Sequence, residues 1–246
     1  QSEKLVTLKG WLTYILCVND MLCIGGDSLC LYSTAERKST ILNVDRVGQI
    51  TVDNENNLYC TTASNIAKVR LLDSTSPEYL FNTGYEGSED GLLSEATVEE
   101  PQGVVWKENV LYVADTNNHL IRQIKEGVVS TISFKQHATG KKATFHRPHI
   151  LGFGPDPNIL FICEEDSLKI ANLQNLTVKQ WWHKDIPIRS LYVDSSGALY
   201  IVSDKSIYKL ESLWKWKRYL WLGHLKEDSS YCHLASLPKE LIKVLL

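Results

Sequence analysis

The feature that most constrains this chain is a pattern that recurs five times along it. Each copy has a polar turn followed by a short apolar strand built around a leucine, and the five leucines are Leu22, Leu58, Leu111, Leu160 and Leu199. Successive copies therefore lie 36, 53, 49 and 39 residues apart. A mean repeat of about 44 residues is the spacing of four-stranded blades in a β-propeller.

The strand pattern within each repeat supports the same fold. Each copy offers four runs of Val, Ile, Leu, Tyr and Thr separated by turn residues, and in the last complete copy the runs are 188–193, 198–203, 206–210 and 216–222. A single blade cannot bury both faces, whereas blades packed around an axis can. We predict an all-β propeller over residues 1–234 with five complete blades. The spare strand 4–8 could close the ring through the last blade, and six blades are the alternative.

The C-terminal residues 235–246 follow a different pattern. Ser236 is a suitable N-cap, Pro238 falls in the first turn, and Leu241, Val244 and Leu245 share one helical face. We predict a short helix that packs on the propeller. The string Leu-Pro-Lys-Glu-Leu at 237–241 also resembles the opening helix of an F-box, so the start of a further module is the alternative.

The third repeat carries a family resemblance. Residues 101–103 read Pro-Gln-Gly, 111–115 read Leu-Tyr-Val-Ala-Asp, and 118–122 read Asn-His-Leu-Ile-Arg. Residues 96–132 thus resemble an NHL repeat, which implies an NHL-type propeller across most of the chain. The carboxylate of Asp115 and the amide of Asn117 can form hydrogen bonds within the turn of this hairpin, so we expect a structural role for both. NHL propellers usually have six blades. The resemblance further implies either protein recognition, as in propellers attached to ubiquitin-ligase modules, or binding of single-stranded RNA.

Charge and cysteine content restrict the class of partner. The chain has 26 Lys and Arg against 29 Asp and Glu, so its net charge of −3 exerts no overall attraction on nucleic acid or anionic membranes. No apolar run reaches the roughly 18 residues of a membrane span, and we expect no membrane partner. Most of the six cysteines replace aliphatic residues in strands, as Cys60 and Cys163 do. We therefore expect free, buried thiols in a cytoplasmic protein, although Cys23 and Cys30 could form a disulfide across a hairpin.

The first residues of the innermost strands should line one mouth of the central channel. The candidates there are Arg46 with Gly48, Gln102, His149 and Arg189. Two arginines, an amide and a histidine could converge on an anionic or carbonyl-bearing ligand, and the alternative is a solvated mouth. Because these positions offer no carboxylate and the chain has no Cys-x-x-Cys pair, we expect no metal and no cofactor.

An aromatic segment near the C-terminus is the second candidate surface. In an extended strand Trp214, Trp216 and Arg218 would share one face. These residue types dominate interface hot spots, and they would equally suit stacking on RNA bases or packing between blades.

These observations favour a non-catalytic recognition domain that binds a protein partner or substrate, within a ubiquitin-ligase-type protein. An acidic stretch between Glu86 and Glu100 supports this choice. The first alternative is a single-stranded RNA-binding domain, for which Lys141, Lys142, Arg147 and residues 215–218 could form a local basic patch. The second alternative is a propeller lyase or hydrolase.

Overall fold

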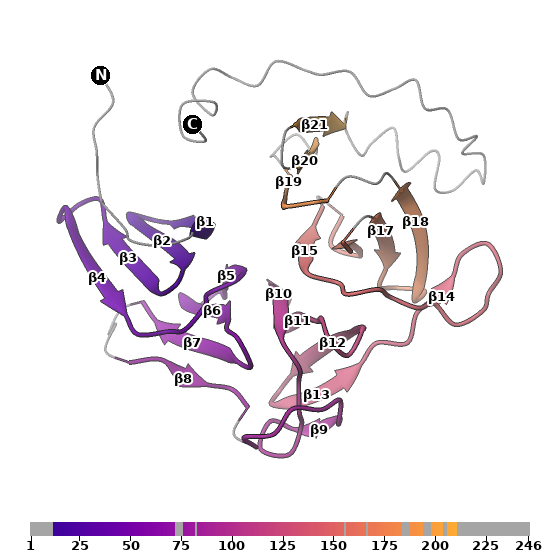
Figure 1. Ribbon diagram of the computed structural model, residues 1–246, viewed down its shortest axis with the longest axis horizontal. Helices are drawn as coiled ribbons and strands as arrows, with labels where there is room; N and C mark the ends of the chain where they lie inside the picture. The colour runs from indigo at the N-terminus through magenta and orange to yellow at the C-terminus, as the bar shows by residue number, and fades with distance from the viewer. Residues whose placement is uncertain are drawn as a thin grey trace.

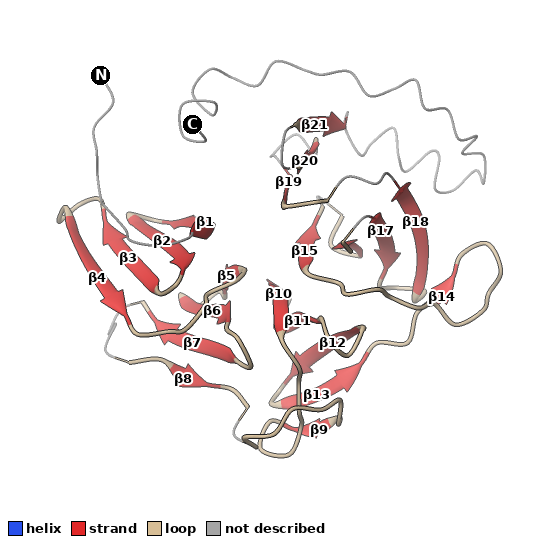
Figure 2. Cartoon of the chain, viewed as in Figure 1, coloured by secondary structure: helices blue, strands red, loops and turns tan. Residues whose placement is uncertain are grey.

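The computed structural model describes residues 12–71, 76–81, 83–154, 156–165, 167–183, 187–193, 198–203 and 206–210. Within these residues the chain forms 21 β-strands and no helix (Figure 2). The predicted strands 4–8 and 216–222, the predicted helix 235–246, Trp214 and Trp216 lie outside the described residues. Among the residues that are described, no helix has the length and hydropathy needed to cross a bilayer.

The strands form five sheets that follow one another around a central axis, as the blades of a propeller do (Figure 1). Blades 1, 2 and 5 have their strands in chain order from the axis to the rim. Blade 1 comprises β1 (Leu12–Val18), β2 (Met21–Gly26), β3 (Leu29–Ser33) and β4 (Lys38–Leu42). Blade 2 comprises β5 (Ile50–Val52), β6 (Asn57–Thr61), β7 (Ile66–Arg70) and β8 (Glu78–Tyr79). The described part of blade 5 comprises β19 (Ser190–Val193), β20 (Leu199–Val202) and β21 (Ile207–Leu210).

Blades 3 and 4 each carry an additional short strand on the outer edge. Blade 3 comprises β10 (Pro101–Lys107), β11 (Val110–Asp115), β12 (Leu120–Lys125) and β13 (Val128–Thr131), with β9 (Gly91–Leu92) antiparallel to β13. Blade 4 comprises β15 (Ile150–Phe153), β16 (Ile159–Cys163), β17 (Ser167–Asn172) and β18 (Thr177–His183), with β14 (Lys135–Gln136) parallel to β18. The connections that contain β9 and β14 account for the two long repeats of 53 and 49 residues.

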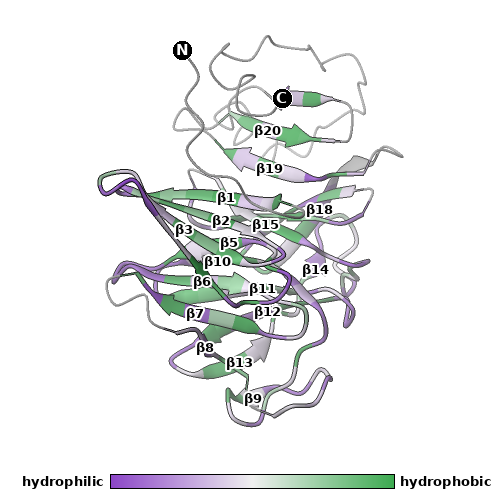
Figure 3. Cartoon of the chain, turned by 60° about the vertical axis from the view of Figure 1, so that its left-hand side comes forward, coloured by the Kyte–Doolittle hydropathy of each residue, from purple (hydrophilic) through white to green (hydrophobic). Residues whose placement is uncertain are grey.

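The core lies between neighbouring blades, where apolar residues of adjacent sheets pack in four clusters, and hydrophobic stretches run along many of the strands (Figure 3). Leu29, Leu31 and Val44 of the first repeat pack with Leu58 and Val69 of blade 2. Similar clusters join blade 2 to blade 3, blade 3 to blade 4, and blade 4 to blade 5. Burial of this apolar surface holds neighbouring blades together, because the strands that the structure describes form five separate hydrogen-bonded sheets.

The cysteines within the described residues are free thiols. Cys23, Cys30, Cys60 and Cys163 are buried, and Cys17 is exposed. A disulfide between Cys23 and Cys30 does not form, because Cys23 lies opposite Leu31 while Cys30 lies opposite Ile24. With this offset of one residue the two side chains project from opposite faces of the sheet. Burial, followed by the neighbouring thiols, raises the pKa of Cys23 to about 12.

Candidate binding face at the channel mouth

One residue in each blade occupies an equivalent place at the start of the innermost strand. Its backbone amide donates to a carbonyl at the end of the second strand of the same blade: Gly48 to Thr61 at 2.9 Å, His149 to Cys163 at 2.9 Å, and Arg189 to Val202 at 2.7 Å. Gln102 takes this place in blade 3, where the register of β10 shifts between Pro101 and Gly103. The fold therefore brings Gln102, His149 and Arg189 to one end of the propeller axis.

Blade 1 contributes a mouth residue that sequence reasoning did not identify. Thr13 lies at the corresponding register shift of β1, between Leu12 and Tyr14. Its hydroxyl donates to the carbonyl of Val47 in the connection to blade 2. Thr13 stands nine residues before Leu22, as Gln102 stands nine residues before Leu111, so this spacing was a signal that sequence reasoning missed.

Arg46 lies beside these positions rather than at one of them. Gly48 is the residue of blade 2 that starts the strand, and Arg46 belongs to the loop before it, with a φ of 46°. The side chain of Arg46 is 72% exposed, and its Nε lies 3.8 Å from Oδ2 of Asp45. An exposed pair of this kind contributes little to stability, so the guanidinium is accessible to a partner.

His149 combines a place at the mouth with a structural contact. Its Nε2 lies 2.9 Å from the carbonyl oxygen of Ile188, in the connection that leads to blade 5. A carbonyl can only accept, so Nε2 carries the proton in this contact. The His149 ring therefore links blade 4 to blade 5, while Gln102 and Arg189 are both exposed at the mouth.

The side chain of Gln49, the residue that follows Gly48 at the mouth, is buried. Gln49 donates from Nε2 to the carbonyl of Leu151 at 2.6 Å, and its Oε1 accepts from the amides of Val104 and Leu151 at 3.1 Å each. One side chain thus joins the innermost strands of blades 2, 3 and 4. Sequence reasoning missed Gln49, because the equivalent positions of later blades are Gly103, Ile150 and Ser190 and the repeat therefore does not mark a glutamine there.

The third repeat is held by a buried ion pair. Arg122 and Asp115 are both fully buried, and Nη1 of Arg122 lies 2.9 Å from Oδ2 of Asp115. Asp115 also accepts hydrogen bonds from the Glu99 amide and the Asn118 side chain, each at 2.9 Å. Burial is the largest influence and raises the pKa of Asp115 above its usual value, although these donors and Arg122 offset part of the rise. The predicted structural role of Asp115 is thus confirmed, but Asn118 makes the contact within the turn that we expected of Asn117.

Asn117 and His119 instead contact the next blade. Nη1 of Arg147 donates to Oδ1 of Asn117 at 2.7 Å, and the Arg147 amide donates to Nδ1 of His119 at 3.0 Å. The His119 ring stacks on His146 with centroids 5.8 Å apart. These contacts among Asn117, His119, His146 and Arg147, called the clasp below, lie next to the mouth, and the two histidines are exposed. The Asn and His of the NHL-like motif were the signal, but their partner in the following loop could not be identified without the fold.

The fourth repeat keeps a charge network although its sequence is degenerate. Glu164 is buried and accepts from the Lys169 ammonium at 2.5 Å and from the Ser167 hydroxyl at 2.7 Å. Lys169 lies opposite Ile162, as Arg122 lies opposite Val113 in blade 3. Glu and Lys therefore replace Asp and Arg in the same place, which explains how the blade is maintained without the motif.

The residues of the described part include no group of three or more His, Cys, Asp or Glu side chains placed to hold a metal ion. The polar groups at the mouth are instead amides, imidazoles and guanidiniums. Such groups bind carbonyl and carboxylate oxygens through hydrogen bonds.

Comparisons with known sequences identify relatives over part of the chain. NHL repeat-containing protein 2 of Bos taurus is 35% identical over 89 residues, which are 35% of this chain and 12% of that protein. The protein of the same name from Gallus gallus is 63% identical over 38 residues, or 15% of this chain and 5% of that protein. The chain thus matches only a small fraction of the length of these relatives. No family model matches the chain.

Solved structures share the fold at low sequence identity. A chain of the nidogen/laminin complex has a TM-score of 0.61 at 16% identity, and the match covers 79% of this chain and 72% of that one. Streptogramin B lyase has a TM-score of 0.55 at 13% identity, with 82% and 80% covered. These likenesses concern the fold alone. The described residues form a β-propeller of five blades, and the sequence relatives that match part of the chain are NHL repeat-containing proteins, which is consistent with an NHL-type propeller.

Proposed function

We propose that this propeller is a non-catalytic recognition domain that binds a protein partner or substrate at the channel mouth. The observation that carries the proposal is the gathering of exposed Gln102, Arg189 and Arg46 at one end of the axis. The strands that present them are fixed by Gln49 and by the His149 contact. A surface that is ordered before binding loses less conformational entropy when a partner docks.

The charges around the mouth favour a protein over RNA. Asp45 lies beside Arg46, and Oε2 of Glu100 lies 4.0 Å from Nη2 of Arg147. Carboxylates next to the arginines would repel a phosphate backbone, while a protein surface can match both signs. The fold neighbour from the nidogen/laminin complex adds a precedent in which a chain of similar fold occurs in a complex of proteins.

The lyase or hydrolase reading has weaker support. Streptogramin B lyase shares the fold, but that likeness transfers no residues. Nδ1 of His119 accepts from the Arg147 amide, and Nε2 of His149 carries the proton that it donates to the Ile188 carbonyl, so neither of these two nitrogens is free to act as a base. The proposal also includes a ubiquitin-ligase-type context, which rests on the resemblance to NHL repeats. It includes a cytoplasmic location as well, which rests on the free thiols.

Capture experiments with paired substitutions test the proposal. We expect the double variant Arg46→Ala/Arg189→Ala or the double variant Trp214→Ala/Trp216→Ala to lose a partner that the wild-type chain captures from cell lysate. Glu108→Ala, at the opposite end of β10, is the matched control and should retain capture. A random single-stranded RNA pool should bind no better than about 1 µM at physiological salt. Unchanged capture by both double variants, or tighter RNA binding, would overturn the proposal.

A further inference from the structure

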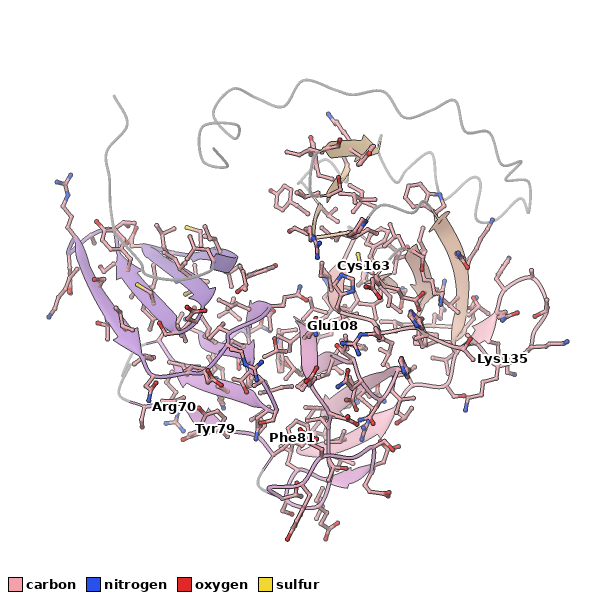
Figure 4. The ribbon with its side chains drawn as sticks, viewed as in Figure 1. Arg70, Tyr79, Phe81, Glu108, Lys135 and Cys163 are labelled. Atoms are coloured by element: carbon pink, nitrogen blue, oxygen red, sulfur yellow. The ribbon has the colours of Figure 1, made fainter. Side chains whose placement is uncertain are left out.

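A cationic hairpin stands on the outer edge of blade 4. It comprises residues 135–142, in which β14 pairs with β18 and Lys135 forms an antiparallel bridge with Lys142. Every residue of this hairpin is exposed. Lys135 lies at the far rim of the molecule, away from the propeller axis (Figure 4). The hairpin is therefore a surface separate from the channel mouth.

The backbone of the hairpin is fixed to the blade at both ends. The amides of Lys135 and His137 donate to the carbonyls of Leu176 and Val178 at 2.8 and 2.9 Å. On the returning side the Ala143 amide donates to the Phe134 carbonyl at 2.8 Å. These contacts hold the hairpin in place although none of its side chains is buried.

The tip of the hairpin is also ordered by its own contacts. The Gly140 amide donates to the carbonyl of Gln136 at 2.8 Å, and Gly140 adopts a φ of 67°. The Thr139 hydroxyl donates to Oε1 of Gln136 at 2.8 Å and accepts from the Lys141 amide at 3.3 Å. The lysines on either side are thus presented on a defined turn.

The charge of this segment is uniformly positive and uncompensated. Residues 127–155 contain four Lys and Arg, three His, and no Asp or Glu. In the described part of the chain, no carboxylate lies within 4.0 Å of the ammonium groups of Lys135, Lys141 or Lys142. Lys135 and Lys142 face each other directly across the bridge, and like charges so placed repel. An anion between them would relieve that repulsion.

We propose that the hairpin 135–142 is a docking surface for an acidic segment of a protein partner. Carboxylates of such a segment would form charge-assisted hydrogen bonds with Lys135, Lys141 and Lys142. The fixed backbone lowers the conformational entropy that a flexible loop would lose on binding. The surface lies outside the mouth and adds a second contact to the function proposed above.

The surroundings favour an acidic protein segment over nucleic acid. Residues 71–106, which include the outer part of neighbouring blade 3, contain eight Asp and Glu and no Lys or Arg. A phosphate backbone running along the rim would be repelled there, whereas a short acidic segment needs only the hairpin. The hairpin also contains no Phe, Tyr or Trp on which bases could stack.

Fluorescence anisotropy with a labelled decaglutamate peptide tests this proposal on the full chain. We expect the peptide to bind at low salt, and Lys141→Gln/Lys142→Gln to weaken its affinity by about tenfold. The control Lys38→Gln/Lys125→Gln removes the same charge from exposed positions on other blades and should change affinity by less than about twofold. Thr139→Val keeps every charge but removes the two hydrogen bonds of the Thr139 hydroxyl at the tip, and it should weaken binding by about threefold.

Three outcomes would overturn the proposal. They are absence of peptide binding, equal loss in the hairpin and control variants, and stronger binding of a decauridylate RNA than of the peptide. The mouth and the hairpin are tested by separate readouts, because the mouth is tested by capture from lysate and the hairpin by the difference in peptide affinity between Lys141→Gln/Lys142→Gln and Lys38→Gln/Lys125→Gln. A failure at the mouth is therefore distinguishable from a failure at the hairpin.

Discussion

At the residue scale, the NHL-like repeat depends on a charge pair that no solvent reaches. Removing Asp115 and Arg122 from water costs several kcal/mol per ion, which their attraction and the additional hydrogen bonds offset. The sequence correctly indicated a structural Asp115, because the Val-Ala-Asp string marks the end of a strand. It could not distinguish Asn117 from Asn118, since which amide faces the carboxylate depends on the turn geometry.

We predict that Asp115→Asn lowers the free energy of unfolding by about 3–5 kcal/mol, because it removes the buried one of the two carboxylates that pair with the buried Arg122 guanidinium. Urea denaturation followed by tryptophan fluorescence measures the change. Asp90→Asn is the matched control: this second partner of Arg122 has a side chain that is 46% exposed, so the loss should stay near 1 kcal/mol. Equal losses in the two variants would contradict a special role for the buried pair.

The thiols provide a second test at this scale. Burial raises the pKa of Cys60 to about 12, as it does for Cys23. The reactive thiolate of each is therefore scarce at neutral pH, and even at pH 9 it makes up only about 0.1% of the thiol.

In the folded protein a disulfide reagent should modify exposed Cys17 rapidly, and Cys23 and Cys60 only as fast as the protein unfolds. Mass spectrometry of digested protein at successive times locates the label. Cys17→Ser should remove the rapid phase at that site and leave the other rates unchanged. Rapid labelling of Cys60 in native protein would show that blades 1 and 2 do not pack as described.

At the scale of elements, the close approach of neighbouring strands to β10 limits the size of the side chain that fits at Gly103. A Cβ at Gly103 would lie 3.0 Å from the Ala114 Cβ and 3.1 Å from the His149 carbonyl oxygen. The Pro-x-Gly motif therefore has a packing reason in this chain. No sequence motif marks Gln49 in this way, because its three hydrogen bonds to β10 and β15 form only when the blades are assembled.

Gly103→Ala should lower the free energy of unfolding by about 2 kcal/mol, since the rigid backbone of blade 4 must move to admit a methyl group. Gly152→Ala serves as the control, because the added Cβ would meet only the tip of the Leu191 side chain, which can rotate. Its cost should stay below about 1 kcal/mol, and the same denaturation experiment compares the two. A smaller loss for Gly103→Ala than for Gly152→Ala would contradict the packing described here.

At the scale of the whole molecule, the repeat predicted the propeller because each copy contains strands that cannot be buried alone. The regular spacing of Leu58, Leu111, Leu160 and Leu199 correctly indicated successive blades. The outer strands β9 and β14 were missed, because two-residue strands in polar insertions have no apolar alternation. The mouth positions of Gln102, His149 and Arg189 followed from the repeat, whereas the clasp around Arg147 required the packing of two blades.

The most direct test of the central claim is photo-crosslinking from a single position at each end of β10. A benzophenone amino acid replaces Gln102 at the mouth in one variant and Glu108 beyond the opposite end of the strand in another. The six steps along the chain from position 102 to position 108 place the two probes roughly 20 Å apart on the same blade. We predict that the probe at position 102 crosslinks one dominant protein partner and that the probe at 108 does not. Crosslinking of that partner only from 108, or of RNA alone from 102, would contradict the claim that the mouth is a protein-binding face.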